Sequence, residues 1–203
     1  MAHHNVLIIG IGTLGKTALA HMNMVSEGSE KTPTLLVNPD TQSANDENAS
    51  VSISGSDNQY ALSHRIIDHI TCLPQRPKAI LLIAEATAQN LNEMHFISAF
   101  CNLAQEHGYY VTGLVFDGSL RLSQTKPEKP SPRLGTYTCA FDRFCRFNVG
   151  DLYQLAKADN AQKLNQLSLA DFAIWIDQLF VTYADHAVHF YQTIDMPWES
   201  QCS

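Results

Sequence analysis

The chain has 203 residues, of which 45% are hydrophobic and 16% are charged, a composition that supports a buried core in one globular domain and excludes a disordered chain. Its 13 Lys and Arg residues against 20 Asp and Glu residues give a formal charge of -7, so it lacks the basic excess that favours nucleic-acid binding. The apolar runs are short, and none approaches the ~20 residues of a membrane span. We therefore expect a cytoplasmic protein with no nucleic-acid partner and no membrane insertion.

The cysteines and histidines do not form a metal-binding pattern. The five cysteines are widely spaced, with no C-x-x-C pair, which predicts reduced thiols rather than a zinc site or a disulfide framework. His186 and His189 lie beside Asp185 at a helical spacing, but no third ligand is in register with them. No metal site is expected.

Short apolar runs alternate with helical patterns in the first part of the chain. The expected strands cover 5–10, 34–38, 79–84 and 111–116, with a short additional strand (VSI) inside the polar stretch 40–58. The expected helices cover 16–25, 59–72 and 92–107, where apolar residues recur at helical spacing. This alternation predicts an α/β fold with a doubly wound, mainly parallel sheet and helices on both faces.

The second part begins with a Pro-rich stretch, 119–135, that we expect to be an exposed loop. A strand-like segment, YTCAFDRFCRF, and a helical segment, DLYQLAKA, follow it. Between Ser168 and Ile194 apolar residues step by three and one, which predicts one long C-terminal core helix with Ser168 as its N-cap. We expect a single domain over 1–203, with flexible ends at 1–4 and 195–203.

A glycine-rich turn follows the first expected strand and precedes the first helix. It reads GIGTLGKT and fits both G-x-G-x-x-G and G-x-x-x-x-G-K-[ST], two patterns whose backbone N–H groups bind phosphate. The candidate phosphate-binding residues are Gly10, Gly12, Thr13, Gly15, Lys16 and Thr17.

Three interpretations of this turn remain open. A dinucleotide site would use Asp40, which lies just beyond the second expected strand. A nucleoside triphosphate site would place Lys16 on the phosphates and Thr17 on magnesium, with Asp117 closing another strand. In the third interpretation the glycines serve only to close a tight crossover from strand to helix.

The turn and the second strand together resemble the nucleotide-binding domain of the tubulin/FtsZ superfamily, in particular bacterial FtsZ. The matching residues are Gly10, Gly12, Gly15, Ala18 and Met22 in the turn and helix, and Asn38-Pro39-Asp40-Thr41-Gln42 where the family has N-T-D-x-Q. VSISG, AILLIA and GYYVTGLVF are similar to further strands of that family. The resemblance implies the Rossmann-like GTPase-domain fold. It also implies that Phe172 stacks on a guanine base and Asp177 accepts hydrogen bonds from it, with Asn148 nearby.

The sequence departs from the family at the phosphate clamp. Where FtsZ has G-G-G-T-G-T-G after the third strand, this chain has EATAQNLN over 85–92, with no glycine. Glu85 and Glu93 add negative charge there, and we expect Glu93 to act as a built-in anion at a helix N-terminus. Thr17 replaces the Asn that FtsZ places near guanine. The chain ends at Ser203, where FtsZ continues into a second domain that completes hydrolysis, so we expect the family mechanism to lack that contribution.

These observations favour a divergent FtsZ-like protein that acts by protein association, with a partner or with its own copies, as a scaffold or regulator. A role related to cell division is what the resemblance implies. We expect weak or no GTPase activity and no catalytic residue, and GTP or GDP is the expected nucleotide, ahead of ATP or NAD, if one binds. The alternative is a ParA/MinD-like ATPase or GTPase, or a dinucleotide enzyme, built on Gly10–Thr17. The signature lysine of the ParA/MinD turn would be Ile11 here.

Overall fold

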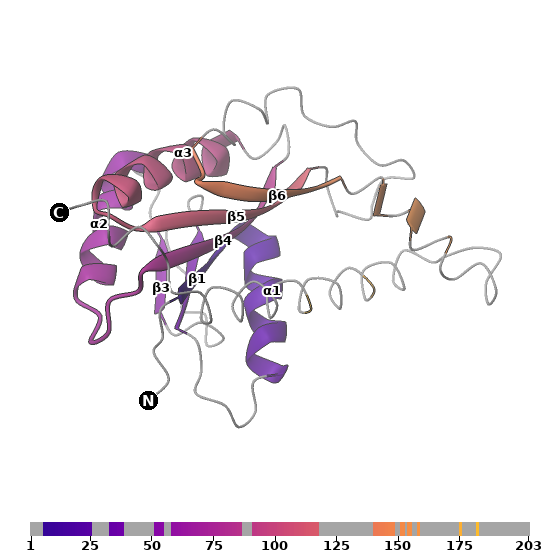
Figure 1. Cartoon of the computed structure of the whole chain (residues 1–203), viewed down its shortest axis with the longest axis horizontal. Coiled ribbons are helices and arrows are strands. Elements are labelled where there is room, and N and C mark those ends of the chain that lie inside the picture. Colours follow the sequence, from indigo (N-terminus) through magenta and orange to yellow (C-terminus); the bar gives the residue numbers. More distant parts are fainter. Residues whose placement is uncertain are drawn as a thin grey trace, which may run out of the picture.

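A computed structural model gives the fold of the chain (Figure 1). It describes residues 6–25, 33–38, 51–54, 58–86, 91–117, 140–148, 151–152, 154–155, 158, 175 and 182. The elements are β1 (Val6–Ile11), α1 (Gly12–Val25), β2 (Thr34–Asn38), β3 (Val51–Ser54), α2 (Gln59–Thr71), β4 (Ala79–Ala86), α3 (Leu91–Glu106), β5 (Tyr110–Asp117) and β6 (Arg143–Asn148).

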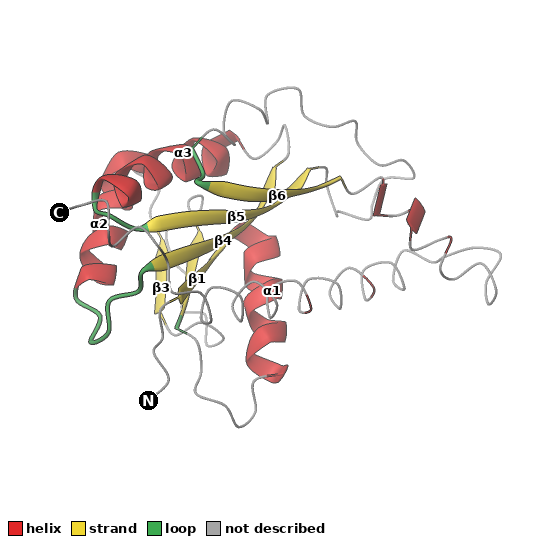
Figure 2. Ribbon diagram, viewed as in Figure 1, coloured by secondary structure: helices red, strands yellow, loops and turns green. Residues whose placement is uncertain are grey.

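The six strands form one sheet in the order β3-β2-β1-β4-β5-β6. All five neighbouring pairs are parallel, which confirms the predicted parallel sheet. α1 covers one face of the sheet, and α2 and α3 pack side by side on the other (Figure 2). The chain is therefore doubly wound from β1 outward, first through β2 and β3 and then through β4, β5 and β6. The direction of winding reverses between β1 and β4, which in such sheets is where ligands bind.

The core lies on both faces of the sheet, because parallel strands covered by helices bury every side chain. Alternate residues of β1, Leu7, Ile9 and Ile11, join the large apolar cluster under α2 and α3. Ile8 is equally buried, as is Leu19 of α1. This is why the strand sequences read as continuous apolar runs rather than as alternating patterns.

β6 is attached to β5 through residues at its start. Val111 donates its backbone N–H to Asp142 Oδ2 at 2.7 Å, and Asp142 donates its own N–H to the Val111 carbonyl at 3.0 Å. The Phe141 ring lies directly on Gly113, where an added Cβ would be 2.6 Å from Cε1 of the ring. β6 begins at Arg143, later than the strand-like segment YTCAFDRFCRF suggests. Residues 140–142 form a turn instead, which places the Phe141 ring on Gly113.

Other element boundaries also differ from the sequence expectation. α1 begins at Gly12 rather than Lys16, so the glycine turn is the first turn of the helix. β4 continues through Glu85 to Ala86, because these residues pair with Phe116 and Asp117 of β5. The short strand predicted inside 40–58 is confirmed as β3.

The long C-terminal helix lies almost entirely outside the described residues. Of the segment 168–194, the structure describes Trp175 and Thr182, and both are helical. The loop 119–135 and the two chain ends, 1–4 and 195–203, also lie outside this part. None of the helices in the described ranges is long and apolar enough to cross a membrane.

Candidate functional site

The glycine turn lies at the carboxyl end of β1, at the point where the strand order reverses. β1 pairs with β2 on one side and with β4 on the other. α1 starts directly at the end of β1, so the N–H groups of its first turn, which have no partner within the helix, lie at this edge of the sheet. Such a helix N-terminus at a switch point is the usual phosphate-binding position of doubly wound folds.

Two of the three glycines are required by the packing of α1 on β1. A Cβ on Gly10 would lie 2.6 Å from the carbonyl oxygen of Gly15, and a Cβ on Gly15 would lie 2.6 Å from the Cα of Gly10. The Gly15 position is also 3.2 Å from the carbonyl oxygen of Ile83 in β4. The backbone of α1 thus packs directly against the backbone of β1, and neither Gly10 nor Gly15 has room for a side chain. These two glycines fit the interpretation of a tight strand-to-helix crossover.

The third glycine, Gly12, is required by its conformation and by an acidic neighbour. Its φ is 65°, in the left-handed region that favours glycine. A Cβ at Gly12 would meet the carboxylate of Glu93, 2.8 Å from Cδ and 2.9 Å from Oε2. The Glu93 carboxylate therefore lies directly against the α carbon of Gly12. The space that the absent side chain leaves is taken by another residue of the same chain.

Glu93 and Glu85 are both buried at this edge. Glu93 lies in the first turn of α3 and is 7% exposed, and Glu85 is the last residue but one of β4 and is 8% exposed. Glu85 lies near the end of β4, the strand next to β1 at the switch point, and Glu93 follows that strand in the sequence. Because like charges repel strongly where water is excluded, two carboxylates here oppose the binding of a phosphate group.

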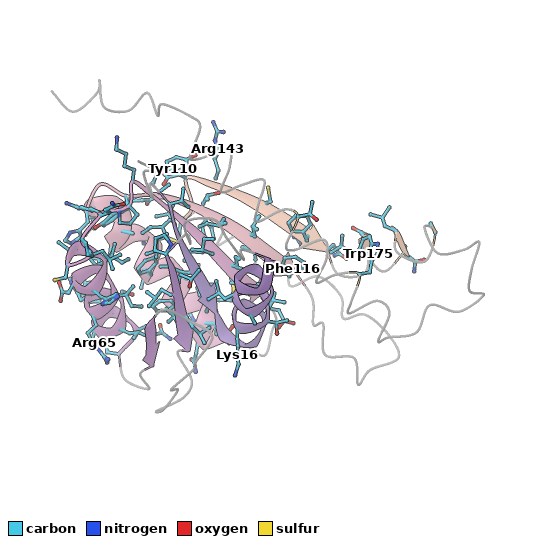
Figure 3. All side chains as sticks on the ribbon, turned by 90° about the horizontal axis from the view of Figure 1, so that it is seen from below. Lys16, Arg65, Tyr110, Phe116, Arg143 and Trp175 are labelled. Carbon is cyan, nitrogen blue, oxygen red and sulfur yellow. The ribbon has the colours of Figure 1, made fainter. Side chains whose placement is uncertain are left out.

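Lys16 and Thr17 follow the turn within α1. Lys16 is exposed and points outward (Figure 3), and Thr17 is half-buried. Thr13 lies in the first turn of the same helix. The structure thus brings Gly10, Gly12, Gly15 and Glu93 together.

Comparisons with known proteins decide the fold family. No family model and no curated protein matches the sequence. Among solved structures, an empty FtsZ dimer from M. jannaschii superposes with a TM-score of 0.62 at 12% identity, over 94% of this chain and 56% of that chain. A tryptophan-to-tyrosine mutant of FtsZ from M. jannaschii gives a TM-score of 0.61 at 11% identity, over 93% of this chain and 57% of that chain. The chain has the tubulin/FtsZ fold.

This result confirms the resemblance found in the sequence, and at such low identities it concerns the fold alone. A truncated TubZ from Clostridium botulinum phage c-st is also similar, with a TM-score of 0.46 and 9% identity over 60% of this chain and 44% of that chain. The FtsZ-like chain spans little more than half the length of the two FtsZ chains.

Asn148, expected near a guanine base, has a structural role in the FtsZ-like fold. It is the last residue of β6, and its side-chain Oδ1 accepts the backbone N–H of Asp151 at 3.1 Å. Asp151 is helical, and an Asn three residues earlier that accepts its N–H makes the hydrogen bond typical of an N-cap. β6 is three strand spacings from β1, about 14 Å across the sheet. The expected place of Asn148 near a guanine base stays a prediction.

The remaining predicted base and ribose contacts lie outside the described residues. These are Asp40, Phe172 and Asp177, and their roles stay predictions. Asp117, the acidic residue expected to close another strand in the triphosphate interpretation, is the last residue of β5 and pairs in register with Asn148.

The cysteines of the FtsZ-like domain are free thiols where the structure describes them. Cys72 and Cys145 are exposed and Cys101 is buried. Burial, and secondly the negative charge of Asp142, raise the pKa of the Cys101 thiol well above its usual range. Cys101 is therefore a protonated core residue rather than a nucleophile. Within the described ranges, no three His, Cys, Asp or Glu side chains are grouped so as to hold a metal ion.

The contact between Glu93 and Gly12 is the feature of the site that sequence motifs alone did not give. The sequence placed Glu93 at a helix N-terminus, and the structure confirms its position in the first turn of α3. The identity of its neighbour depends on how β1 and β4 pair. The sequence feature that could have predicted this contact is an acidic residue, here Glu93, that comes shortly after the strand next to β1 in the sheet.

Proposed function

We propose that this FtsZ-like domain acts by protein association, as a scaffold or regulator in a role related to cell division, and that it hydrolyses little or no GTP. The observation that carries the proposal is the carboxylate of Glu93 against the α carbon of Gly12. The chain itself fills the turn that a nucleotide phosphate would have to approach.

The electrostatic cost to a bound phosphate supports this proposal. One pair of like charges 4 Å apart repel by about 1 kcal/mol in water and by about 4 kcal/mol near a protein surface. A nucleotide with a dissociation constant of about 1 μM binds with a free energy of about -8 kcal/mol, and each 1.4 kcal/mol of binding free energy that is lost raises that constant about tenfold. Repulsion from Glu93 alone, at about 4 kcal/mol, would therefore weaken such binding by roughly a thousandfold.

The composition of the segment after β4 supports the proposal in a second way. Residues 85–92 contain no glycine, and Glu85 and Ala86 are part of the strand itself. A side chain on each residue keeps a ligand away from the backbone and disfavours positive φ angles. A phosphate clamp made of closely approaching backbone N–H groups is not available from such a segment.

Association in our proposal uses the stretches 40–58 and 119–135, which are the longest polar connections in the sequence. Neither nucleotide nor hydrolysis would be needed for the contact. The net charge of -7 opposes uncontrolled stacking of copies at low salt. We therefore propose a small oligomer or a complex with a protein partner rather than extended filaments.

Nucleotide binding is tested on the full chain by its thermal unfolding in 1 mM Mg-GTP. A ligand present at 100 times its dissociation constant adds about 2.7 kcal/mol, which raises the Tm of a domain of this size by roughly 5–11 °C. We expect no measurable rise and no phosphate release above that of a buffer control. Steady GTP turnover by purified protein would refute the proposal.

The association itself is tested by sedimentation velocity over a range of salt and protein concentrations. We expect concentration-dependent oligomers that GTP does not change. A strict monomer at every concentration that also binds no division protein in a defined binding panel would contradict the proposed role.

The strand order supports a second candidate, a nucleotide-binding enzyme. The order β3-β2-β1-β4-β5-β6 is that of dinucleotide-binding folds, and Lys16 is exposed near the start of α1. If this candidate is right, Mg-ATP, Mg-GTP or NAD should raise the Tm in the thermal assay. The rise caused by either triphosphate should be lost in the Lys16→Ala variant.

A further inference from the structure

We propose that the outer edge of β6 is a dimer interface, at which the β6 strands of two copies of this chain pair antiparallel about a two-fold axis. This inference rests on the proposed function and deepens it, because it assigns one surface and one partner to the association. The surface is a strand, separate from the two polar stretches named above, and the sheets of the two copies become one continuous sheet.

β6 is the last strand of the sheet that the described residues form, and it lies at the border of that sheet in Figure 1. It pairs with β5 over its whole length of six residues, Arg143–Asn148, and no described strand pairs with its other side. The outward N–H and C=O groups of an edge strand are a template for a further strand. The side chains of Arg143, Cys145 and Arg146 are exposed, so a second chain can approach this strand.

Two-fold symmetry limits the ways in which two β6 strands can pair. The same surface takes part on both copies, so one residue at the centre of the pair lies opposite itself. Because β6 covers 143–148, only a centre at Cys145, which pairs 143–147, or at Arg146, which pairs 144–148, uses most of the strand. A centre at Arg146 places two like charges directly opposite each other, which destabilises a strand pair. The register centred on Cys145 avoids this contact.

The register centred on Cys145 also pairs arginine with an aromatic ring. Arg143 lies opposite the partner's Phe147, and the symmetry repeats this pair at the other end of the interface. Guanidinium groups are attracted to the faces of aromatic rings. The ring of Phe147 is held at the edge of the sheet by Phe116 of β5, with the two ring centroids 5.0 Å apart. β6 is therefore complementary to a second copy of itself.

An acidic residue just before β6 balances the second arginine. Arg146 has the partner's Asp142 and the partner's Arg146 as its diagonal neighbours, which long side chains can reach. Asp142 is exposed, and its carboxylate is fixed in place because Oδ2 accepts the backbone N–H of Val111 at 2.7 Å. The carboxylate of each copy thus offsets the repulsion between the two Arg146 side chains.

The decisive experiment uses Cys145 as a probe of the register. In paired antiparallel strands the Cα atoms of opposite residues are about 4.5–5.5 Å apart, a distance at which a disulfide can form. The full chain is prepared with Cys72→Ser, Cys139→Ser and Cys202→Ser, which leaves the exposed Cys145 and the buried Cys101. Diamide, which oxidises two thiols to a disulfide, should then link two copies through Cys145.

Two variants of this background distinguish the proposed register from chance collisions between exposed thiols. Cys145→Ser removes the probe and should give no linked dimer. Cys145→Ser combined with Arg146→Cys moves the thiol by one position, where the Cα atoms of the two copies would be about 7–8 Å apart, beyond the ordinary range for a disulfide. This variant should form the linked dimer several times more slowly than the parent does.

A charge at the centre of the interface tests the pairing without any cross-link. Cys145→Lys places two positive charges directly opposite each other, and Cys72→Lys, at the exposed cysteine that ends α2, is the matched control. In sedimentation velocity of the full chain, the wild type and Cys72→Lys should dimerise as the concentration rises. The dimer dissociation constant of Cys145→Lys should be at least about tenfold higher, and circular dichroism checks that both variants are folded.

Three results would overturn the inference. The first is that the variant with Arg146→Cys links as fast as the parent, and the second is that folded Cys145→Lys dimerises as well as the wild type. The third is a wild type that stays monomeric at every concentration, in which case Arg143 and Arg146 protect the edge strand from pairing. The cross-linking leaves β6 itself unchanged, so it decides the question even if Cys145→Lys does not fold.

The proposed function fails or survives on different results. Oligomers that form through another surface, or a monomer that binds a division protein, overturn the β6 interface and leave the proposed function standing. GTP turnover by the wild type refutes the proposed function whatever the cysteine variants do.

Discussion

Gly15→Ala tests whether the glycine turn is built for close packing of the backbone. The substitution adds a Cβ that would lie 2.6 Å from the Cα of Gly10 and 3.2 Å from the carbonyl oxygen of Ile83. Ordinary van der Waals contact begins at 3.4 Å, so the Cα of Gly10 is too near by about 0.8 Å, the difference between 3.4 and 2.6 Å, and the carbonyl carbon of Gly10 is nearer still. No side-chain rotation relieves the clash, because both neighbours are backbone. α1 would have to move away from β1.

The expected cost follows from two opposing effects. Overpacking costs about 1–3 kcal/mol, and a clash between rigid backbones belongs at the upper end of that range. Alanine is favoured over glycine inside a helix by about 1 kcal/mol, which offsets part of the cost. The net loss in the free energy of unfolding is therefore about 2 kcal/mol, equivalent to a fall in Tm of roughly 4–8 °C.

The assay is urea and thermal unfolding followed by circular dichroism, with Gly108→Ala as the matched control. Gly108, unlike Gly15, has a positive φ, 79°, and a Cβ there would meet nothing within 4 Å. Gly108→Ala should therefore lower the free energy of unfolding by about 1–2 kcal/mol, through the unfavourable backbone conformation alone. A Gly15→Ala variant that melts at or above the wild type would refute the packing argument, because helix propensity would then be the dominant effect.

Two further predictions concern a buried thiol and an arginine that joins two loops. Because burial raises the pKa of Cys101 in the folded state, the unfolded thiol loses its proton first, and stability should fall above pH 9 by up to about 1.4 kcal/mol per pH unit. Urea unfolding from pH 8 to 10 should show this slope in the wild type and a smaller one in Cys101→Ala; equal slopes would contradict it. Arg76 donates to the Tyr109 hydroxyl and to the His107 carbonyl, each at 2.9 Å, so Arg76→Ala should lose about 1–2 kcal/mol in the free energy of unfolding. Arg65→Ala, at an exposed position of α2, should lose less than about 0.5 kcal/mol, and equal losses would show that the Arg76 hydrogen bonds contribute nothing.

Local sequence patterns were enough to predict the parallel α/β layout of the described residues. Apolar runs such as AILLIA can be buried on both faces only between two layers of helices, and the intervening segments have helical spacing. The sequence also predicted that the glycine turn lies between β1 and α1, because strand, turn and helix are consecutive in the chain. Such features depend on residues within about twenty positions of one another in the chain, so the spacing of apolar residues predicts them.

The contacts of the glycine turn, by contrast, depend on residues that are far apart in the sequence. Gly10 and Gly15 are needed because α1 folds back onto β1 with backbone against backbone. β4 extends to Ala86 because β5 offers a partner that far along the strand, and the Asn148 side chain accepts the backbone N–H of Asp151. Glu93 meets Gly12 because the reversal of strand order places β4 beside β1. Contacts across a sheet depend on which strands pair and how far, and no local pattern in the sequence encodes that choice.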